Sequence, residues 1–330
     1  MVRWNMIRLA AFSLIALAWL PVLVCAQSLE PAGNHVGRDA DNYYRIGMAR
    51  ADEGKYEEAV NNLRQALSVR PDFALAHNDL GYVYYKAGKF EEAVKAYQEA
   101  IRLRNDYALA YNNLGMAYSA LQQYEEAIKA LKRAINLRHD YAAAYYNLGT
   151  TFYKSGRSEA AVDALKQSIS LKADNPWVYY NLGVAYSDLY RYEDAVRSFE
   201  DALALQPEFV PAHRGLGLAY HKLNRIKEAI EAYSKAVRLR KDDAESFNNL
   251  GVAYIEARQY QEAINAYQQA IRLNPKYFEA HYNLGAAYLS IDKKDDAIRQ
   301  YAVLKAMHAG FANDLYRLIY KDSLLILTRK

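Results

Sequence analysis

The sequence predicts an all-α solenoid built from eight two-helix repeats, and three observations lead to this fold class. A dipeptide of Leu or Ile followed by Gly recurs every 34 residues without an insertion, from Ile46-Gly47 to Leu284-Gly285. Within each period the apolar residues fall on one face of each of two successive helices. The 330 residues include only 15 Gly and 7 Pro, so turn-forming residues are scarce and short connections between helices are favoured.

Composition narrows the classes of protein further. A hydrophobic share of 52% suits a folded chain and argues against disorder, collagen and a polytopic membrane protein. The 42 basic and 38 acidic residues give a net charge of +4, which is too balanced to indicate a nucleic-acid partner. A single Cys excludes both a disulfide framework and a Cys-based zinc site. The chain has 31 Tyr, an unusually large number, and most of them fall at repeated packing positions.

Residues 1–26 are predicted to be a secretory signal peptide. Two Arg and no acidic residue precede an apolar run at 9–24, and the expected cut follows Ala26. The run is shorter than the roughly 20 residues that span a bilayer, although an uncleaved membrane anchor stays open as the alternative. Residues 27–39 contain Pro and Gly and are predicted to be a linker. The protein is therefore expected to be exported, to the periplasm or the secreted space.

The repeats are numbered from residue 40, and a residue's place within its repeat is called its repeat position. Apolar residues at repeat positions 4, 7, 8 and 11 predict a first helix, and those at 17, 20, 24 and 27 predict a second. Gly at position 8 and Ala at position 20 indicate that the two helices cross there. One such hairpin cannot bury its apolar face alone, so neighbouring repeats must stack. The eight repeats are 40–73, 74–107, 108–141, 142–175, 176–209, 210–243, 244–277 and 278–311.

Residues 312–330 are predicted to form a C-terminal capping helix and a tail. Leu315, Leu318 and Ile319 have helical spacing, as expected of a helix that covers the open end of a solenoid. For the apolar run at 324–327, packing against the last repeat and a contact between two copies of the chain both stay open.

The recurring residues resemble those of the tetratricopeptide repeat family. The family uses a large residue, then Leu-Gly, then Tyr, Ala, Phe or Tyr, and Pro, and this chain has these residue types at the same positions. The match covers all eight repeats. The resemblance implies a right-handed superhelix with a concave groove lined by the first helix of each repeat. It also implies that repeat positions 2, 5, 9, 12 and 13 face this groove and that position 6 borders it.

Aromatic residues gather at these groove positions in repeats 2 to 5, where the core does not need them. Tyr and Trp are large and rigid and have a polar tip, which suits a surface that binds another protein. The alternative is that the rings only pack against the next repeat. The predicted groove residues are Tyr82, Tyr85, Asn112, Met116, Tyr146, Tyr153, Trp177 and Tyr180.

Repeat position 6 carries a series of Asn residues, with Asp79 in the second repeat. The series resembles the asparagine ladder in the repeat arm of O-linked N-acetylglucosamine transferase, where the amides hold the backbone of an extended peptide. A plain repeat consensus is the alternative, and a transferase is not expected because only 19 residues follow the repeats. The predicted ladder is Asn113, Asn147, Asn181, Asn249 and Asn283.

Two basic residues of the sixth repeat, Arg214 and Lys222, are predicted to meet an acidic group of a ligand. Co-chaperones of the family clamp a C-terminal carboxylate with basic residues at positions 5 and 13 and Asn at position 9. Arg214 and Lys222 stand at positions 5 and 13, but no repeat has Asn at position 9. The full clamp is therefore not expected.

No catalytic motif, cofactor site or metal site is expected. His77, His213 and His281 occupy repeat position 4, where other repeats have Tyr or Phe, and are interpreted as packing residues. The predicted function is a non-enzymatic scaffold of the cell envelope or secreted space that binds an extended peptide or partner segment. A structural assembly factor that acts through the convex face or the tail, and a carbohydrate-binding role, are the alternatives.

Overall fold

The computed structural model describes residues 35–171 and 174–327, so the predicted signal peptide lies outside the described part. The described residues form 17 helices and no strand, which confirms the all-α solenoid. The helices are α1 (His35–Asp52), α2 (Tyr56–Val69), α3 (Ala74–Lys86), α4 (Phe90–Leu103), α5 (Ala108–Ala120), α6 (Tyr124–Leu137), α7 (Ala142–Lys154), α8 (Ser158–Ser170), α9 (Pro176–Asp188), α10 (Tyr192–Leu205), α11 (Val210–Lys222), α12 (Ile226–Leu239), α13 (Ala244–Glu256), α14 (Tyr260–Leu273), α15 (Phe278–Leu289), α16 (Lys294–Met307) and α17 (Ala309–Leu327).

Helix starts follow the 34-residue period. From α3 to α15 every odd-numbered helix begins at repeat position 1, and from α2 to α16 every even-numbered helix begins at position 17. The two ends differ. Helix α1 begins at His35, so residues 35–39, which we assigned to a linker, are helical, and α17 begins at Ala309. A helix can extend beyond its packed part because each added residue contributes a hydrogen bond once the first turn exists.

Glycine at repeat position 8 makes room for a large side chain of the second helix. A Cβ on Gly81 would lie 2.7 Å from Cδ1 of Tyr97, and one on Gly115 would lie 2.5 Å from Cγ of Leu131. Tyr97 and Leu131 stand at position 24, so the closest side chain comes from that position. The backbone oxygen of Ala127, at position 20, would lie 3.2 Å from a Cβ on Gly115, so the helices do cross at positions 8 and 20 as expected. In the last repeat the corresponding contact comes from Leu315 of α17, which is fully buried.

The turn between the two helices of a repeat has one residue with left-handed backbone at position 15. Three repeats place Gly there, as at Gly88 with a φ of 75°. In the other five the residue has a side chain, and Tyr190 has a φ of 58°. Left-handed backbone is unfavourable for residues other than Gly, so these turns carry local strain. The five residues are Gln122, Tyr190, Asn224, Arg258 and Asp292.

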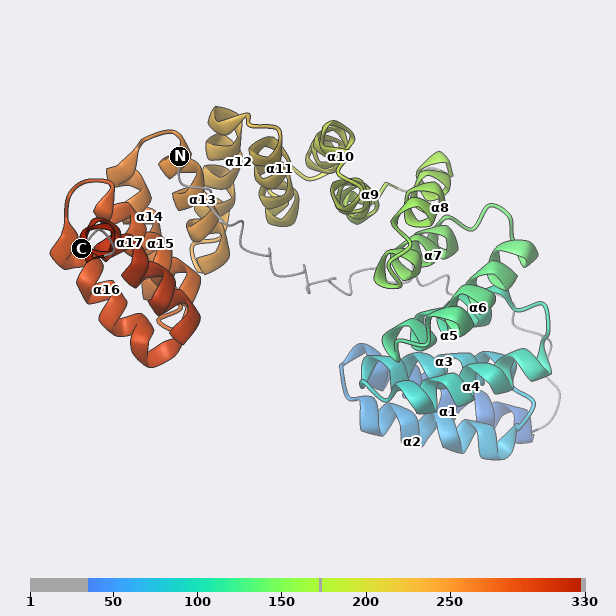
Figure 1. The fold of residues 1–330 in the computed structure, drawn as a ribbon. Coiled ribbons are helices and arrows are strands. Elements are labelled where there is room, and N and C mark those ends of the chain that lie inside the picture. Colours follow the sequence, from blue (N-terminus) through green and yellow to red (C-terminus); the bar gives the residue numbers. More distant parts are fainter. Residues whose placement is uncertain (1–34, 172–173, 328–330) are drawn as a thin grey trace.

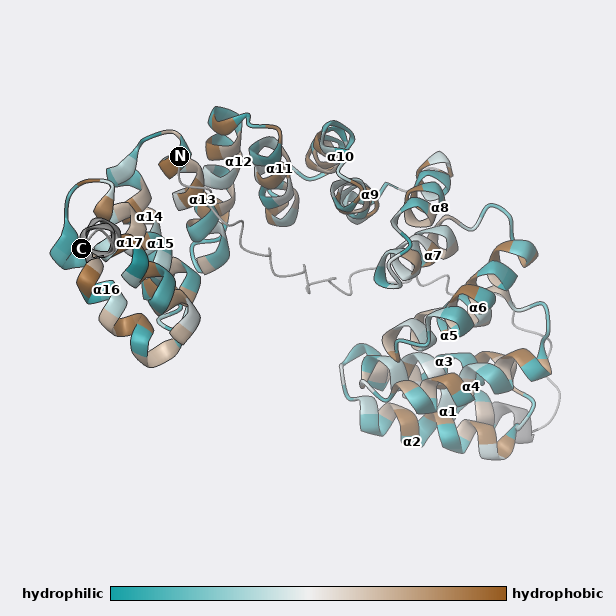
Figure 2. Cartoon of the chain, viewed as in Figure 1, coloured by the Kyte–Doolittle hydropathy of each residue, from teal (hydrophilic) through white to brown (hydrophobic). Residues whose placement is uncertain are grey.

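The repeats stack into an arc, and the odd-numbered helices line its inner side (Figure 1). Each odd helix from α1 to α9 packs against the next odd helix, and α13 packs against α15. The even helices do not pack against each other to this extent. Closer spacing of the odd helices is what curves the stack toward them. Hydrophobic and hydrophilic residues alternate along each helix, as expected of helices with one buried and one exposed face (Figure 2). The buried residues form six clusters along the described part of the chain. Among the described helices, none combines the length and the apolar character needed to span a membrane.

Candidate functional site

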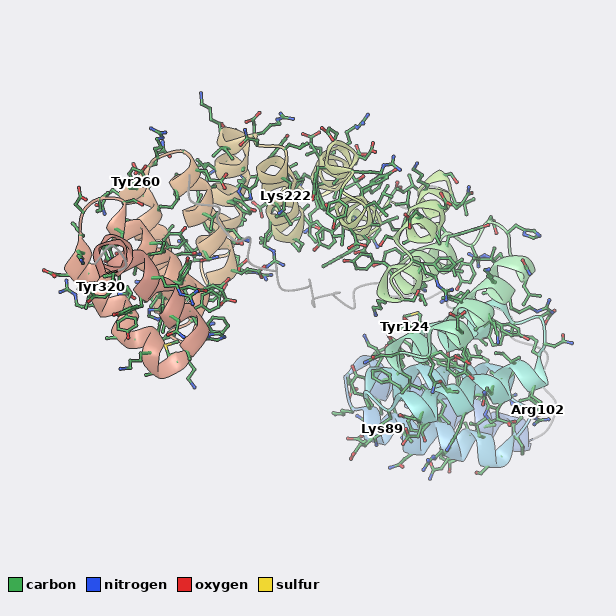
Figure 3. All side chains as sticks on the ribbon, viewed as in Figure 1. Lys89, Arg102, Tyr124, Lys222, Tyr260 and Tyr320 are labelled. Atoms are coloured by element: carbon green, nitrogen blue, oxygen red, sulfur yellow. The ribbon has the colours of Figure 1, made fainter. Side chains whose placement is uncertain are left out.

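The inner side of the arc, called the concave face below, is the candidate site. Side chains stand on both sides of the ribbon along the arc (Figure 3). Five of the predicted groove residues are half-buried on the odd helices, so each has one part of its side chain packed and another part accessible. These are Tyr82, Tyr85, Met116, Tyr153 and Trp177.

Three predicted groove residues are buried, which corrects the expectation that they face a ligand. Tyr146 is 7% exposed, Tyr180 is 5% exposed and Asn112 is 4% exposed. All three stand at repeat position 5, which points into the junction with the next repeat. Burial raises the pKa of Tyr146 and of Tyr180 to about 12. The Tyr146 hydroxyl accepts a hydrogen bond from Asn181 of the next repeat. The Tyr180 ring packs against rings of its own repeat, Trp177, Phe199 and Phe209.

Trp177 sits at the first turn of α9, at the junction of repeats 5 and 6. Its ring meets Phe209 edge to face at a centroid distance of 4.7 Å, and Tyr180 in the same way at 5.6 Å. The side chain of Asn175 caps the helix by accepting a hydrogen bond of 2.9 Å from the Trp177 backbone N–H. The indole is therefore held in place by its neighbours while it stays half-buried at the concave face.

The asparagines at repeat position 6 are hydrogen-bonded to the preceding repeat. Each donor is an Nδ2 group, and each acceptor is the side chain at position 5 of the repeat before it. The pairs are Asn113 to Asn78 (3.1 Å), Asn147 to Asn112 (2.8 Å), Asn181 to the hydroxyl of Tyr146 (3.1 Å) and Asn283 to Asn248 (3.0 Å). The expected role was to hold a peptide backbone, whereas the observed bonds hold neighbouring repeats in register. The sequence signal for this pairing was a polar residue at position 5 of one repeat and an Asn 35 residues later, at position 6 of the next.

Besides the junction of repeats 1 and 2, where Asp79 takes the place of Asn, two junctions lack this amide bond for reasons visible in the sequence. Between repeats 5 and 6 the position-6 residue is Gly215, which has no side chain. The ring of Phe199 covers it so closely that a Cβ on Gly215 would lie 2.6 Å from Cζ of Phe199. Between repeats 6 and 7 the position-5 residue is Arg214, and Asn249 of the predicted ladder is half-buried opposite it without such a bond.

Asp79 takes the place of an Asn in this series. Its carboxylate accepts a hydrogen bond of 2.6 Å from the Tyr44 hydroxyl and one of 2.9 Å from Nδ2 of Asn78. Burial raises the pKa of Asp79, and these two hydrogen bonds oppose the shift only in part. The second repeat therefore holds a partly desolvated carboxyl group where the others have an amide.

Arg214 is already paired with acids of the same chain, which corrects the expectation that it waits for an acidic ligand. Its guanidinium lies 2.8 Å from Oε2 of Glu245 and 3.8 Å from Oδ2 of Asp243, and its side chain is 14% exposed. Burial raises the pKa of Glu245, while the charge of Arg214 lowers it. Lys222, the other predicted cation, is half-buried at the end of α11.

The three histidines at repeat position 4 each contact a backbone carbonyl oxygen. A ring nitrogen of His77 lies 3.0 Å from the carbonyl oxygen of Pro71, and the same contact recurs at His213 and at His281. Each of these histidines follows a repeat that ends in Pro at position 32. Within the ranges that the structure describes, no group of three His, Cys, Asp or Glu is placed to hold a metal ion.

Two family models match the chain. Residues 21–249 match the model described as the cilia and flagella-associated protein 70 C-terminal domain, and residues 253–292 match a tetratricopeptide repeat model. A search of curated proteins found no match.

Solved structures of tetratricopeptide repeat proteins share the fold. The C-terminal part of a repeat protein from Cytophaga hutchinsonii is 20% identical with a TM-score of 0.59, over 73% of this chain and 99% of that one. A chain of the APC/C hetero-tetramer Cut9-Hcn1 is 18% identical with a TM-score of 0.56, over 80% of this chain and 52% of that one. YrrB, described as having an unusual peptide-binding site, is 22% identical with a TM-score of 0.50, over 57% of this chain and 96% of that one.

Proposed function

Because the chain belongs to the tetratricopeptide repeat family of the cilia and flagella-associated protein 70 C-terminal domain, we propose that it is a binding scaffold without catalytic activity. The ligand is a peptide or an extended partner segment that lies on the concave face of repeats 2 to 5. The observation that carries the proposal is the set of half-buried side chains on the inner helices, Tyr82, Tyr85, Met116, Tyr153 and Trp177. The peptide-binding site described for YrrB, a protein of similar fold, supports it.

The half-burial of these side chains favours binding for a physical reason. A ring that is already packed along one edge has lost most of its rotamer freedom, so contact with a ligand costs little further entropy. Trp177 shows this most clearly, because Phe209 and Tyr180 fix its orientation. Aromatic anchors of this kind carry a large share of the binding energy in protein interfaces.

The test uses substitutions that the chain itself already contains at the same repeat position. Tyr85 and Tyr153 stand at position 12, where repeats 3 and 5 have Ser119 and Ser187. A Tyr85→Ser, Tyr153→Ser double variant should therefore fold and lose its partner. The control is Tyr190→Ser, which removes a Tyr ring that is 80% exposed in a turn.

Partners are identified by crosslinking in intact cells followed by mass spectrometry, and the captured partner's segment is then titrated as a peptide. The fluorescence of Trp177 should change when the peptide binds to the wild-type chain or to the control variant. The double variant should bind at least tenfold more weakly. Unchanged affinity of the double variant would show that the ligand does not lie on this surface.

We also propose that the protein works outside the cytoplasm, on the basis of the predicted signal peptide at 1–26. Cleavage after Ala26 should give a mature chain that begins at Gln27. The intact mass of the protein isolated from the periplasm or medium measures this directly. A full-length mass in the membrane fraction would support the uncleaved anchor instead.

A further inference from the structure

The last two residues of the inner helices follow a period of two repeats, not one. Repeats 2, 4 and 6 have an aromatic residue at position 12 followed by Lys at position 13, whereas repeats 3 and 5 have Ser followed by a small or acidic residue. The first set is Tyr85-Lys86, Tyr153-Lys154 and His221-Lys222, and the second is Ser119-Ala120 and Ser187-Asp188. Lys222 is labelled on α11 in Figure 3.

Position 12 of one repeat lies beside position 13 of the next. The ring nitrogen of His221 lies 2.8 Å from Oε1 of Glu256, which is such a pair. The equivalent pair in repeats 3 and 4 is Ser119 and Lys154. Thr151, which is on the same side of α7 as Lys154, donates a hydrogen bond of 3.4 Å to the Ser119 hydroxyl. Each Lys at position 13 thus stands beside a small residue at position 12 of the preceding repeat, Ala51, Ser119 or Ser187.

Lys86 and Lys154 have no carboxylate partner among the described residues. Neither lysine takes part in the ion pairs of the described residues, which involve Arg side chains, His221 and Lys55. Lys86 and Lys154 are exposed, and burial of part of the Lys154 side chain lowers the pKa of its ammonium group. The Nζ of Lys86 lies 5.9 Å from the centre of the Tyr82 ring, which favours a cation there.

We propose that Lys86 and Lys154 bind two acidic side chains of the peptide that occupies the concave face, and this rests on the function proposed above. Neighbouring packed helices lie about 8–10 Å apart, so two repeats correspond to roughly 20 Å. An extended peptide covers that length in about six residues. The partner segment therefore has two Asp or Glu residues about six positions apart, with apolar residues between them that contact Tyr85, Met116 and Tyr153.

Acidic side chains fit this surface better than a C-terminal carboxylate. No repeat has Asn at position 9, and the position-5 amides of repeats 2 and 3, Asn78 and Asn112, are buried in the junctions, where they accept hydrogen bonds from the next repeat. They are therefore not placed to bind the two oxygens of a chain end. The two lysines are also two repeats apart, so one carboxylate cannot reach both of them.

The test compares short synthetic peptides by fluorescence anisotropy. The probe is a labelled seven-residue peptide with an amidated C-terminus, glutamate at both ends, and alternating leucine and serine between them. A second peptide has glutamine in place of both glutamates. The wild-type chain should bind the glutamate peptide at least tenfold more tightly than the glutamine peptide at low salt. The preference should shrink as salt is raised, because exposed charge pairs are screened.

The variant is Lys86→Met with Lys154→Met, which keeps an unbranched apolar stem and removes the charge. It should bind the two peptides within twofold of each other. The matched control is Lys132→Met with Lys166→Met, two exposed lysines on the even helices α6 and α8, and it should keep the preference. Circular dichroism of both variants checks that the helices are intact.

Failure of this inference is distinguishable from failure of the proposed function. Equal binding of the two peptides to the wild-type chain, no binding of the glutamate peptide, or an equal loss in the control variant would each overturn the lysine assignment. If the glutamine peptide binds as tightly and the Tyr85→Ser, Tyr153→Ser variant loses it, the concave face is the binding surface and the lysines are not part of it.

Discussion

Asn147 offers a direct test of the hydrogen bonds that join neighbouring repeats. Its Nδ2 donates a bond of 2.8 Å to Oδ1 of Asn112, which is almost fully buried. In an Asn147→Ala variant this buried oxygen loses its partner. A buried polar atom without a hydrogen bond costs about 1–3 kcal/mol. The junction between repeats 3 and 4 should therefore lose about 1–3 kcal/mol of stability.

Hydrogen exchange measured by mass spectrometry suits this prediction better than global unfolding. A solenoid opens locally because each repeat contacts only its neighbours. Amides of α5 (Ala108–Ala120) and α7 (Ala142–Lys154) should exchange faster in the variant. Since about 1.4 kcal/mol is a factor of ten in an equilibrium constant, the expected acceleration is roughly 5- to 150-fold.

The chain contains its own control for this experiment. Asn249 stands at the same repeat position and is half-buried to a similar degree, but it makes no such bond to the preceding repeat. Asn249→Ala should change local stability by less than about 0.5 kcal/mol. If the two variants lose the same stability, or if exchange in α5 and α7 is unchanged in Asn147→Ala, the amides do not hold the repeats together.

Three further outcomes follow from the same structure. Burial raises the pKa of Asp79, so just above pH 3.8 the folded chain keeps a proton that the unfolded chain has lost. Stability therefore falls as the pH rises from the ordinary 3.8 through the raised value. Asp79→Asn should raise Tm at pH 7 and remove this dependence in thermal melts from pH 4 to 7. Gly81→Ala should lower the free energy of unfolding in urea by about 1–3 kcal/mol, because its Cβ would meet the Tyr97 ring. Gly88→Ala should lower it by about 1 kcal/mol, from backbone strain alone. Equal losses of stability in the two variants would contradict this. Tyr190→Gly should stabilise the chain by about 0.5–1 kcal/mol in the same assay by relieving left-handed backbone, and a lower stability would show that the Tyr190 ring contributes more than the strain costs.

The helices could be predicted from the sequence because the information that places them is local. Apolar spacing, Gly at position 8 and the turn at position 15 repeat every 34 residues, and the helices of repeats 2 to 8 begin where this frame puts them. The predicted crossing of the two helices at positions 8 and 20 is confirmed, since a Cβ on Gly115 would lie 3.2 Å from the backbone oxygen of Ala127, but the closer contact with the large side chain at position 24 was not predicted.

The concave face was predicted less well because it depends on how one repeat is rotated against the next. Tyr146 and Tyr180 seemed free to meet a ligand, but the stacking turns position 5 into the junction and buries them. Arg214 likewise meets Glu245, an acid 31 residues away that no motif connects with it. The predicted rings at positions 9 and 12 are instead half-buried, namely Tyr82, Tyr85 and Tyr153.

The contact of Phe199 with Gly215 has a mechanical consequence for the arc. A directional hydrogen bond between amides resists sliding of one repeat over another, because a small displacement breaks its geometry. A ring on a glycine resists separation but has no preferred direction along the surface. The junction of repeats 6 and 7 also lacks the amide bond but has the ion pair of Arg214 with Glu245. The arc should therefore be most compliant between repeats 5 and 6, where the Tyr180 hydroxyl and Arg214 make a polar contact in place of the paired amides. A ligand that bridges this junction would set the distance between the two parts of the arc, so occupancy could be read as a change in the span of the molecule.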